Sequence, residues 1–202
     1  LLPEGTTSGK DILGFPLTAP NNGWLNLSGS EYVLPQSSSV FDVSHAFSLE
    51  VWAKNDLTDV SGSVVNHIFS RYSGSSGNRI WALNYKGVYV NFTCSEDGTL
   101  DAGQFKTLSS SSLTFSDWNH LVCTFDNGVM TIFKNGASLA TSDESANFVS
   151  VHVNSARAIE IGSYSGGYGN WNGSLDEVKF YNRALEQAEI TKNYKHGLSK
   201  HS

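Results

Sequence analysis

Two Asn-Gly pairs in the middle of the chain constrain its fold more than any other feature. In residues 118–141, WNHLVCTFDNGVMTIFKNGASLAT, the pairs Asn127-Gly128 and Asn135-Gly136 each separate two runs of strand-forming residues. Asn and Gly tolerate the positive φ angles of a type I′ turn, which joins adjacent antiparallel strands. The segment therefore predicts a three-stranded antiparallel meander.

Short strands with turns between them also fill the rest of the chain. In AFSLEVWAK, Phe47 and Val51 share one face of a predicted strand, and Glu50 and Lys54 share the other. With 19 Gly, 12% aromatic and only 16% charged residues, the composition is that of a β-sandwich. Further strands are predicted at residues 67–72, 79–85, 87–94, 156–164 and 174–182, and a helix at 183–195.

We therefore expect an all-β fold, an antiparallel two-sheet jelly-roll sandwich with one short C-terminal helix. No break in composition divides the chain, so residues 1–202 are predicted to form a single domain with a core at about 11–195. The basic tail at residues 192–202 is expected to fray. The N-terminal residues lack the pattern of a signal peptide, and we expect the chain to be a piece of a larger protein.

Charge and cysteine content exclude several classes of protein. The net charge of -6 and the lack of a basic patch argue against a nucleic-acid partner. No apolar run is long enough to span a bilayer, so membrane insertion is not expected. Cys94 and Cys123 are too few for a disulfide scaffold or a zinc site. They either stay free and buried or pair across neighbouring strands.

Three segments arrive in a familiar order: FSLEVWAK at 47–54, WNHLVCTFDNGVMTIFKNG at 118–136 and GSLDEVKFYNRALEQAEI at 173–190. They resemble the blocks of the laminin-G-like jelly rolls in the concanavalin A-like lectin/glucanase superfamily. The resemblance implies two stacked antiparallel sheets, one of them curved to leave a concave face. The Glu-x-Asp-x-x-Glu run of the glucanase branch is missing from this chain, so the protein is not expected to be an enzyme.

Asp176 and Glu177 stand side by side in the last of these blocks. Consecutive residues of a strand point to opposite faces, so the two are not expected to share one cleft as a catalytic pair. The resemblance implies a structural calcium ion held by Asp176, by Asp11 of the segment DILG and by loop carbonyls and water. The alternative is that Asp176 only caps backbone amides at the end of a strand.

Exposed aromatic side chains are the candidates for sugar binding, because their flat faces stack on the C–H groups of a pyranose. The glycine-rich loop GSYSGGYGNWNG at residues 162–173 offers Tyr164, Tyr168, Asn170 and Trp171. A loop with such residues is a common binding element. Trp171 has an alternative role as a packing residue beneath this loop.

Two further tryptophans lie on predicted strands. Trp52 alternates with the charged residues Glu50 and Lys54, and Trp81 shares a face with Tyr85. Each of the two tryptophans either stacks on a ligand or packs beneath a covering loop.

The sequence therefore predicts a noncatalytic carbohydrate-binding, lectin-like or adhesion module. It would be stabilised by calcium, belong to a larger extracellular or secreted protein, and bind a glycan or cell-surface polysaccharide. The alternative is a display domain on the surface of a phage or virus virion, acting in host attachment or in decoration of a capsid or tail. The close of the chain, RALEQAEITKNYKHGL, is similar to that of jelly-roll domains in phage structural proteins. In that case the partners would include other virion or cell-surface proteins.

Overall fold

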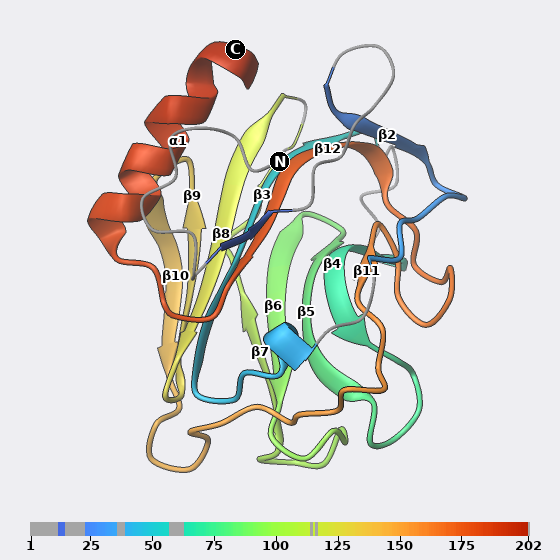
Figure 1. Ribbon diagram of the computed structural model, residues 1–202, viewed down its shortest axis with the longest axis vertical. Helices are drawn as coiled ribbons and strands as arrows, with labels where there is room; N and C mark the ends of the chain where they lie inside the picture. Colours follow the sequence, from blue (N-terminus) through green and yellow to red (C-terminus); the bar gives the residue numbers. More distant parts are fainter. Residues whose placement is uncertain are drawn as a thin grey trace.

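The computed structural model describes residues 12–14, 23–35, 39–56, 63–113, 115 and 117–201, and it arranges them in two antiparallel sheets that pack face to face (Figure 1). The larger sheet follows the order β1 (Ile12–Gly14), β12 (Asn172–Tyr181), β3 (Ala46–Asn55), β8 (Asn119–Asp126), β9 (Val129–Lys134) and β10 (Ala137–Asp143), and β2 (Leu25–Ser28) also pairs with β12. The smaller sheet has the order β11 (Glu160–Ile161), β4 (Val65–Tyr72), β5 (Arg79–Lys86), β6 (Tyr89–Ser95) and β7 (Phe105–Ser109). The described helices are η1 (Ser39–Phe41) and α1 (Gln187–His201). The predicted fold class is confirmed.

The meander predicted from the two Asn-Gly pairs is β8, β9 and β10. Asn127 and Asn135 have φ angles of 46° and 52°, and the glycine that follows each also has a positive φ. Both turns therefore have two residues in the left-handed region, as a type I′ turn requires. Strand pairing continues directly from β8 to β9 and from β9 to β10.

Aromatic side chains from both sheets fill the space between them. The Phe47 ring lies at the centre, 5.9 Å from the Phe180 ring of the same sheet and 6.0 and 5.9 Å from the Trp81 and Phe92 rings of the opposite sheet. All four side chains are at most 1% exposed. Burial of this apolar surface is the main source of stability in a sandwich of this size.

Both cysteines are free and lie in this core. Cys94 is on β6 of the smaller sheet and Cys123 is on β8 of the larger one, so they are not on neighbouring strands. Of the two alternatives that the sequence left open, the structure has the free, buried thiols. Burial raises the pKa of both thiols.

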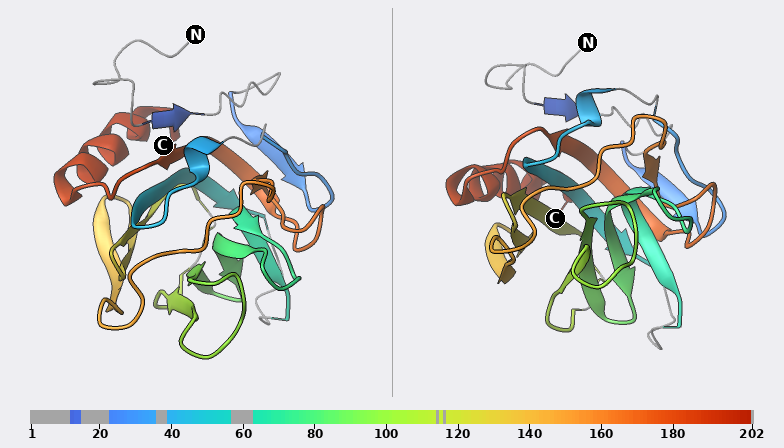
Figure 2. Two further views of the ribbon diagram at one scale, coloured as in Figure 1. Left: turned by 60° about the horizontal axis from the view of Figure 1, so that its bottom comes forward. Right: turned by 90° about the horizontal axis from the view of Figure 1, so that it is seen from below.

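Helix α1 covers the outward face of the larger sheet, the face away from the smaller sheet (Figure 2). Its Ile190 packs with Val122 and Tyr181 of that sheet. The predicted fraying of the tail is wrong, because α1 continues to His201, which is only 8% exposed. No helix in the described part of the chain is long and apolar enough to cross a membrane.

Gly197 sets how closely the last turns of α1 approach the sheet. A Cβ atom at this position would lie 2.5 Å from Trp52 Nε1, far inside contact distance. The helix backbone therefore rests directly on the Trp52 ring. Trp52 is also stacked on the His201 ring, with the ring centroids 4.2 Å apart and the planes 6° from parallel.

Candidate functional site

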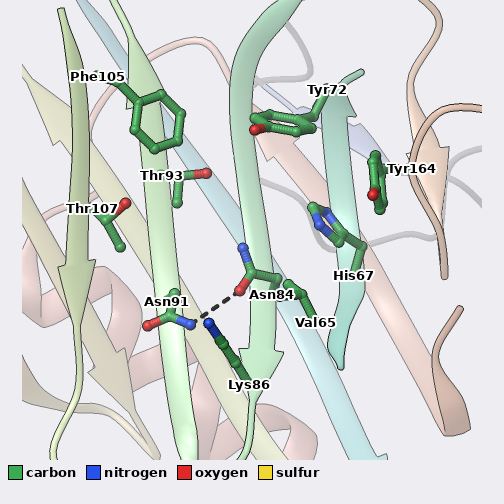
Figure 3. A pocket seen from close by; sticks show the side chains of 10 residues that line it. All are labelled: Val65, His67, Tyr72, Asn84, Lys86, Asn91, Thr93, Phe105, Thr107 and Tyr164. Atoms are coloured by element: carbon green, nitrogen blue, oxygen red, sulfur yellow. Dashed lines mark hydrogen bonds between the residues drawn. The ribbon is translucent and has the colours of Figure 1, made fainter. Parts of the chain in front are cut away.

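The outward face of the smaller sheet is hollowed by an open pocket of about 290 Å³ (Figure 3). Its described lining comes from β4, β5, β6, β7 and the loop that follows β11. Alternate residues of a strand share a face, so on β5, β6 and β7 one row of side chains faces this pocket. On β4 two register shifts interrupt the alternation, and Val65, His67 and Tyr72 face the pocket. The lining residues are Val65, His67, Tyr72, Asn84, Lys86, Asn91, Thr93, Phe105, Thr107 and Tyr164.

The floor of the pocket is polar and its oxygens are ordered by hydrogen bonds. Strand register places Asn84 opposite both His67 and Asn91. Asn91 Nδ2 donates to Asn84 Oδ1 at 3.1 Å, and Ser109 Oγ donates to Asn91 Oδ1 at 2.7 Å. Asn84 thus turns its amide oxygen toward Asn91 and its amide nitrogen toward the pocket (Figure 3).

Three aromatic rings form one wall of the pocket. The His67 ring lies 4.4 Å from the Tyr164 ring and 5.7 Å from the Tyr72 ring, measured between centroids. The Tyr72 and Tyr164 rings meet edge to face at 5.7 Å. Rings with an apolar face and a polar tip suit a ligand that presents both C–H groups and hydroxyls.

His67 has a polar atom without a partner in this wall. The side chain is 4% exposed, and among the described residues its Nδ1 atom has no hydrogen-bond partner. Burial lowers the pKa of His67 to about 3, so the ring is neutral across the physiological range. A neutral imidazole offers one donor and one acceptor. A buried nitrogen that lacks a partner is costly, so a ligand whose hydroxyl reached it would gain a hydrogen bond.

The loop that carries Tyr164 is held rigidly against the sheet. The Glu160 carboxylate accepts hydrogen bonds from Ser163 Oγ at 2.7 Å and from the Gly166 backbone N–H at 3.0 Å, and it also pairs with Arg157. The backbone N–H of His67 donates to the Gly169 carbonyl at 2.7 Å. These contacts fix the position of the Tyr164 ring.

Of the four loop residues predicted to bind a ligand, Tyr164 is the one that lines this pocket. Tyr168 is 66% exposed and exchanges two backbone hydrogen bonds of 2.9 Å with Tyr164, so it lies at the tip of the loop. Asn170 is outside the described lining and has a buried side-chain oxygen without a described partner. The prediction that Trp171 binds ligand is wrong. Trp171 is fully buried and packs at 6.3 Å on the rings of Tyr85 and Phe115, as the alternative had it.

The predictions that Trp52 and Trp81 bind ligand are also wrong, because both are buried. Trp81 is 0% exposed and packs on Phe69 and Phe47 between the sheets. Trp52 is 1% exposed and lies beneath α1. A helix therefore covers it, where the alternative had been a loop. On β5 the face that lines the pocket is therefore the one opposite to Trp81.

Sequence reasoning missed His67, Asn84, Asn91 and the two threonines of the pocket. The available signal was the second face of each strand: in RIWALNYK, residues 82, 84 and 86 alternate with the apolar ones. A shift by one residue exchanges the two faces of a strand. Choosing the aromatic face as the exposed one therefore led to the wrong side of the sheet.

A second group of polar side chains lies beneath α1, on the outward face of the larger sheet. This α1 cluster is centred on Glu50, which is fully buried. Its carboxylate accepts hydrogen bonds from His120 Nε2 at 3.2 Å, Lys179 Nζ at 3.1 Å, Tyr181 OH at 2.7 Å and Asn193 Nδ2 at 2.9 Å. Burial alone would raise the pKa of Glu50, but the hydrogen bond from His120 and the charge of Lys179 outweigh it and lower the pKa to about 2.

Asp176 and Glu177 lie beside the end of α1. The prediction that their side chains point to opposite faces of the strand is wrong. A β-bulge between Asp176 and Lys179, with Glu177 at φ 48°, interrupts the alternation of β12. As a result, ligating atoms of Asp176, Glu177 and His201 come within 4.8 Å of one another. Lys200 Nζ and His201 Nε2 lie 2.8 and 3.0 Å from Asp176 Oδ2.

These contacts do not fit a calcium ion at Asp176. Calcium takes six to eight oxygen ligands, whereas here a lysine ammonium and an imidazole approach the carboxylate. Lys200 Nζ is also 3.8 Å from Glu177 Oε1, so a cation from α1 already faces both carboxylates. Asp176 Oδ1 additionally accepts the backbone N–H of Glu177 at 2.8 Å, a contact of the capping kind. Asp11 lies outside the described residues, and calcium binding stays a prediction.

Comparisons with known proteins agree with this architecture. Over 158 residues the chain is 27% identical to pappalysin-1 of Mus musculus, covering 72% of this chain but only 9% of that protein. The binding domain of botulinum neurotoxin serotype G matches 94% of this chain and 51% of its own, with a TM-score of 0.63 and 15% identity. The Ruminococcus gnavus IT-sialidase CBM40 bound to α2,3-sialyllactose matches 85% of this chain and 96% of its own, with a TM-score of 0.64 and 16% identity.

At 15% and 16% identity, these solved structures show only that the chain shares their β-sandwich fold. The family match covers residues 27–191, which include all the pocket residues and the first five residues of α1. The chain belongs to the concanavalin A-like lectin/glucanase superfamily, as a laminin-G-like jelly roll.

Proposed function

We propose that this protein is a noncatalytic carbohydrate-binding module that binds a glycan in the pocket on the outward face of the five-stranded sheet. The observation that carries the proposal is the unpartnered, buried Nδ1 atom of His67, set in an aromatic wall above a polar floor. Tyr72 and Tyr164 offer ring faces to the sugar, and Asn84 offers an amide nitrogen to its hydroxyls.

The lining of the pocket supports binding rather than hydrolysis. Glycoside hydrolysis uses two carboxyl groups on either side of the scissile bond. None of the described lining residues is acidic. Two buried carboxylates, Glu160 on the smaller sheet and Glu50 on β3 of the larger sheet, each accept several hydrogen bonds from donors within the protein.

The relatives support the same proposal. The sialidase CBM40 was solved with α2,3-sialyllactose, and the similar part of botulinum neurotoxin serotype G is its binding domain. This chain spans 9% of pappalysin-1 and about half of the botulinum toxin binding domain. We propose that it likewise acts within a longer protein. Laminin-G-like domains are typically extracellular, which favours a role outside the cell.

The test is a glycan-array screen of the purified domain, followed by titration calorimetry on the best ligand. Tyr164→Ala is expected to weaken binding about tenfold or more, because stacking on an aromatic ring is lost. The matched control is Tyr168→Ala, which removes an exposed ring from the tip of the same loop. Circular dichroism and thermal melting of both variants report on the fold.

A ligand that binds Tyr164→Ala as tightly as the natural protein would place the site elsewhere and overturn the proposal. An array without any ligand, on a folded domain, would also count against it and would favour a role in assembly or display.

A further inference from the structure

The charge of the pocket differs from that of the whole protein. The chain has 19 acidic and 13 basic residues, which gives a net charge of -6. Yet the ten lining residues include no Asp or Glu, and Lys86 is the one that carries a formal charge. His67 is neutral because burial lowers its pKa to about 3. The pocket is therefore a positive site on an acidic protein, and it favours an anionic ligand.

Two groups on the pocket floor can only donate hydrogen bonds. They are the Asn84 amide nitrogen and the Lys86 ammonium, which point into the pocket region (Figure 3). The hydrogen bond from Asn91 to the Asn84 amide oxygen fixes this orientation of the Asn84 amide. An ionised carboxylate can only accept. A pair of donors, one of them positively charged, therefore suits a carboxylate.

Lys86 is available to a ligand. Within the part of the chain that the structure describes, it forms no salt bridge. It lies two residues from Asn84 on the same face of β5, about 7 Å along the strand, so both side chains can reach one ligand group. A second cation, Arg79, lies beside the Tyr72 hydroxyl and adds to the positive field.

We propose that the ligand of this pocket is an acidic saccharide, whose carboxylate binds Lys86 Nζ and Asn84 Nδ2 while its ring packs on the aromatic wall. This inference rests on the proposed function, since it names the class of glycan that the same pocket takes. Among its lining residues Lys86 is the one that determines the preference for charge.

The experiment compares each glycan that binds on the array as its free acid and as its methyl ester, which removes the charge and changes little else. Titration calorimetry is expected to show about tenfold weaker binding of the ester, the usual scale for a hydrogen bond to a charged group. Lys86→Gln is expected to weaken binding of the acid by a similar factor and binding of the ester much less, so that the preference for the acid is lost. Raising the salt concentration is expected to weaken the acid more than the ester.

Lys195→Gln is the matched control, because it removes the same charge from the exposed surface of α1. Equal binding of acid and ester, or an array on which only neutral sugars bind, would overturn the acidic class and leave the proposed function standing. An acid preference that survives Lys86→Gln would overturn the assignment of Lys86. An array with no ligand at all would remove the proposed function and this inference together.

Discussion

The outward faces of the two sheets carry similar side chains and use them in opposite ways. Beneath α1, the carboxylate of Glu50 accepts four hydrogen bonds, from a histidine, a lysine, a tyrosine and an asparagine. In the pocket, the same four residue types surround a space, and His67 keeps a nitrogen without a described partner. The first set is completed by a helix of the same chain, whereas no described helix covers the second. Residue type alone therefore does not distinguish a binding site from a structural cluster.

Replacing Glu50 by Gln should destabilise the fold more than any other change proposed here, because Glu50 is the centre of the α1 cluster. The change leaves Lys179 and His120 without their carboxylate in a buried site, so the free energy of unfolding should fall by about 3 to 5 kcal/mol. Chemical denaturation measures it, and Glu186→Gln, on the exposed start of α1, is the control that should change stability by less than about 0.5 kcal/mol. A loss of less than about 1 kcal/mol for Glu50→Gln would show that the cluster does not support the fold.

Acidification should act on the same face. The pKa of Glu50 is depressed from 4.5 to about 2 in the folded protein, so its contribution is fully present above pH 4.5 and is lost as the pH falls toward 2. The linkage corresponds to about 3 kcal/mol. Urea denaturation at a series of pH values is expected to show this decline, and the decline should be much shallower in Glu50→Gln. Identical pH profiles would contradict the prediction.

A methyl group at Gly197 should push α1 away from the sheet without touching the pocket. Gly197→Ala places a Cβ 2.5 Å from Trp52 Nε1, and overpacking of this kind costs about 1 to 3 kcal/mol, partly offset by the better helix propensity of Ala. A lower melting temperature with unchanged glycan affinity is expected. Ser199→Ala, on the exposed side of the same helix, is the control. Loss of glycan binding in a folded Gly197→Ala protein would show that the two faces are coupled.

Replacing His67 by Phe in the pocket should weaken ligand binding without lowering the stability of the fold. The ring shape is roughly kept and the unpartnered nitrogen is removed, so the melting temperature should stay the same or rise. Glycan binding should weaken about tenfold, because a hydrogen bond to the ligand is lost. Calorimetry and thermal melting on the same sample measure both. Binding that survives intact would exclude His67 from the site.

Calcium is expected to have the smallest effect. Because Lys200 and His201 already contact Asp176, thermal melting with calcium and with a chelator should give the same midpoint. A calcium ion bound at a hundred times its dissociation constant would instead stabilise the fold by about 2.7 kcal/mol. A shift of several degrees that disappears in both Asp176→Asn and Asp11→Asn would support the calcium site that the sequence predicted.

The fold was predictable because its signals are local. Asn127-Gly128 and Asn135-Gly136 specify turns by their backbone conformation, and the alternation in β3 specifies a strand with two faces. The site was less predictable, because it depends on which face of each strand another element covers. The sequence left open whether Trp52 is exposed or covered, and α1 covers it. Tyr164 was predicted because it lies in a glycine-rich loop. The sequence did not predict the bulge at Glu177, because Glu rarely adopts the positive φ angle that it has there.

Strands form the floor of the pocket and a loop forms part of one wall. This arrangement determines which residues can change during evolution. Gly169 is fixed, because a Cβ there would lie 2.5 Å from the Val65 carbonyl oxygen, and Gly166 and Gly167 have φ angles of 81° and 103°, which side chains rarely adopt. Tyr168, between these glycines, is 66% exposed. The glycines therefore keep the backbone of the loop constant while the exposed side chain at position 168 can change. New ligand preferences can then be selected from a library at Tyr164 and Tyr168 that leaves the three glycines unchanged.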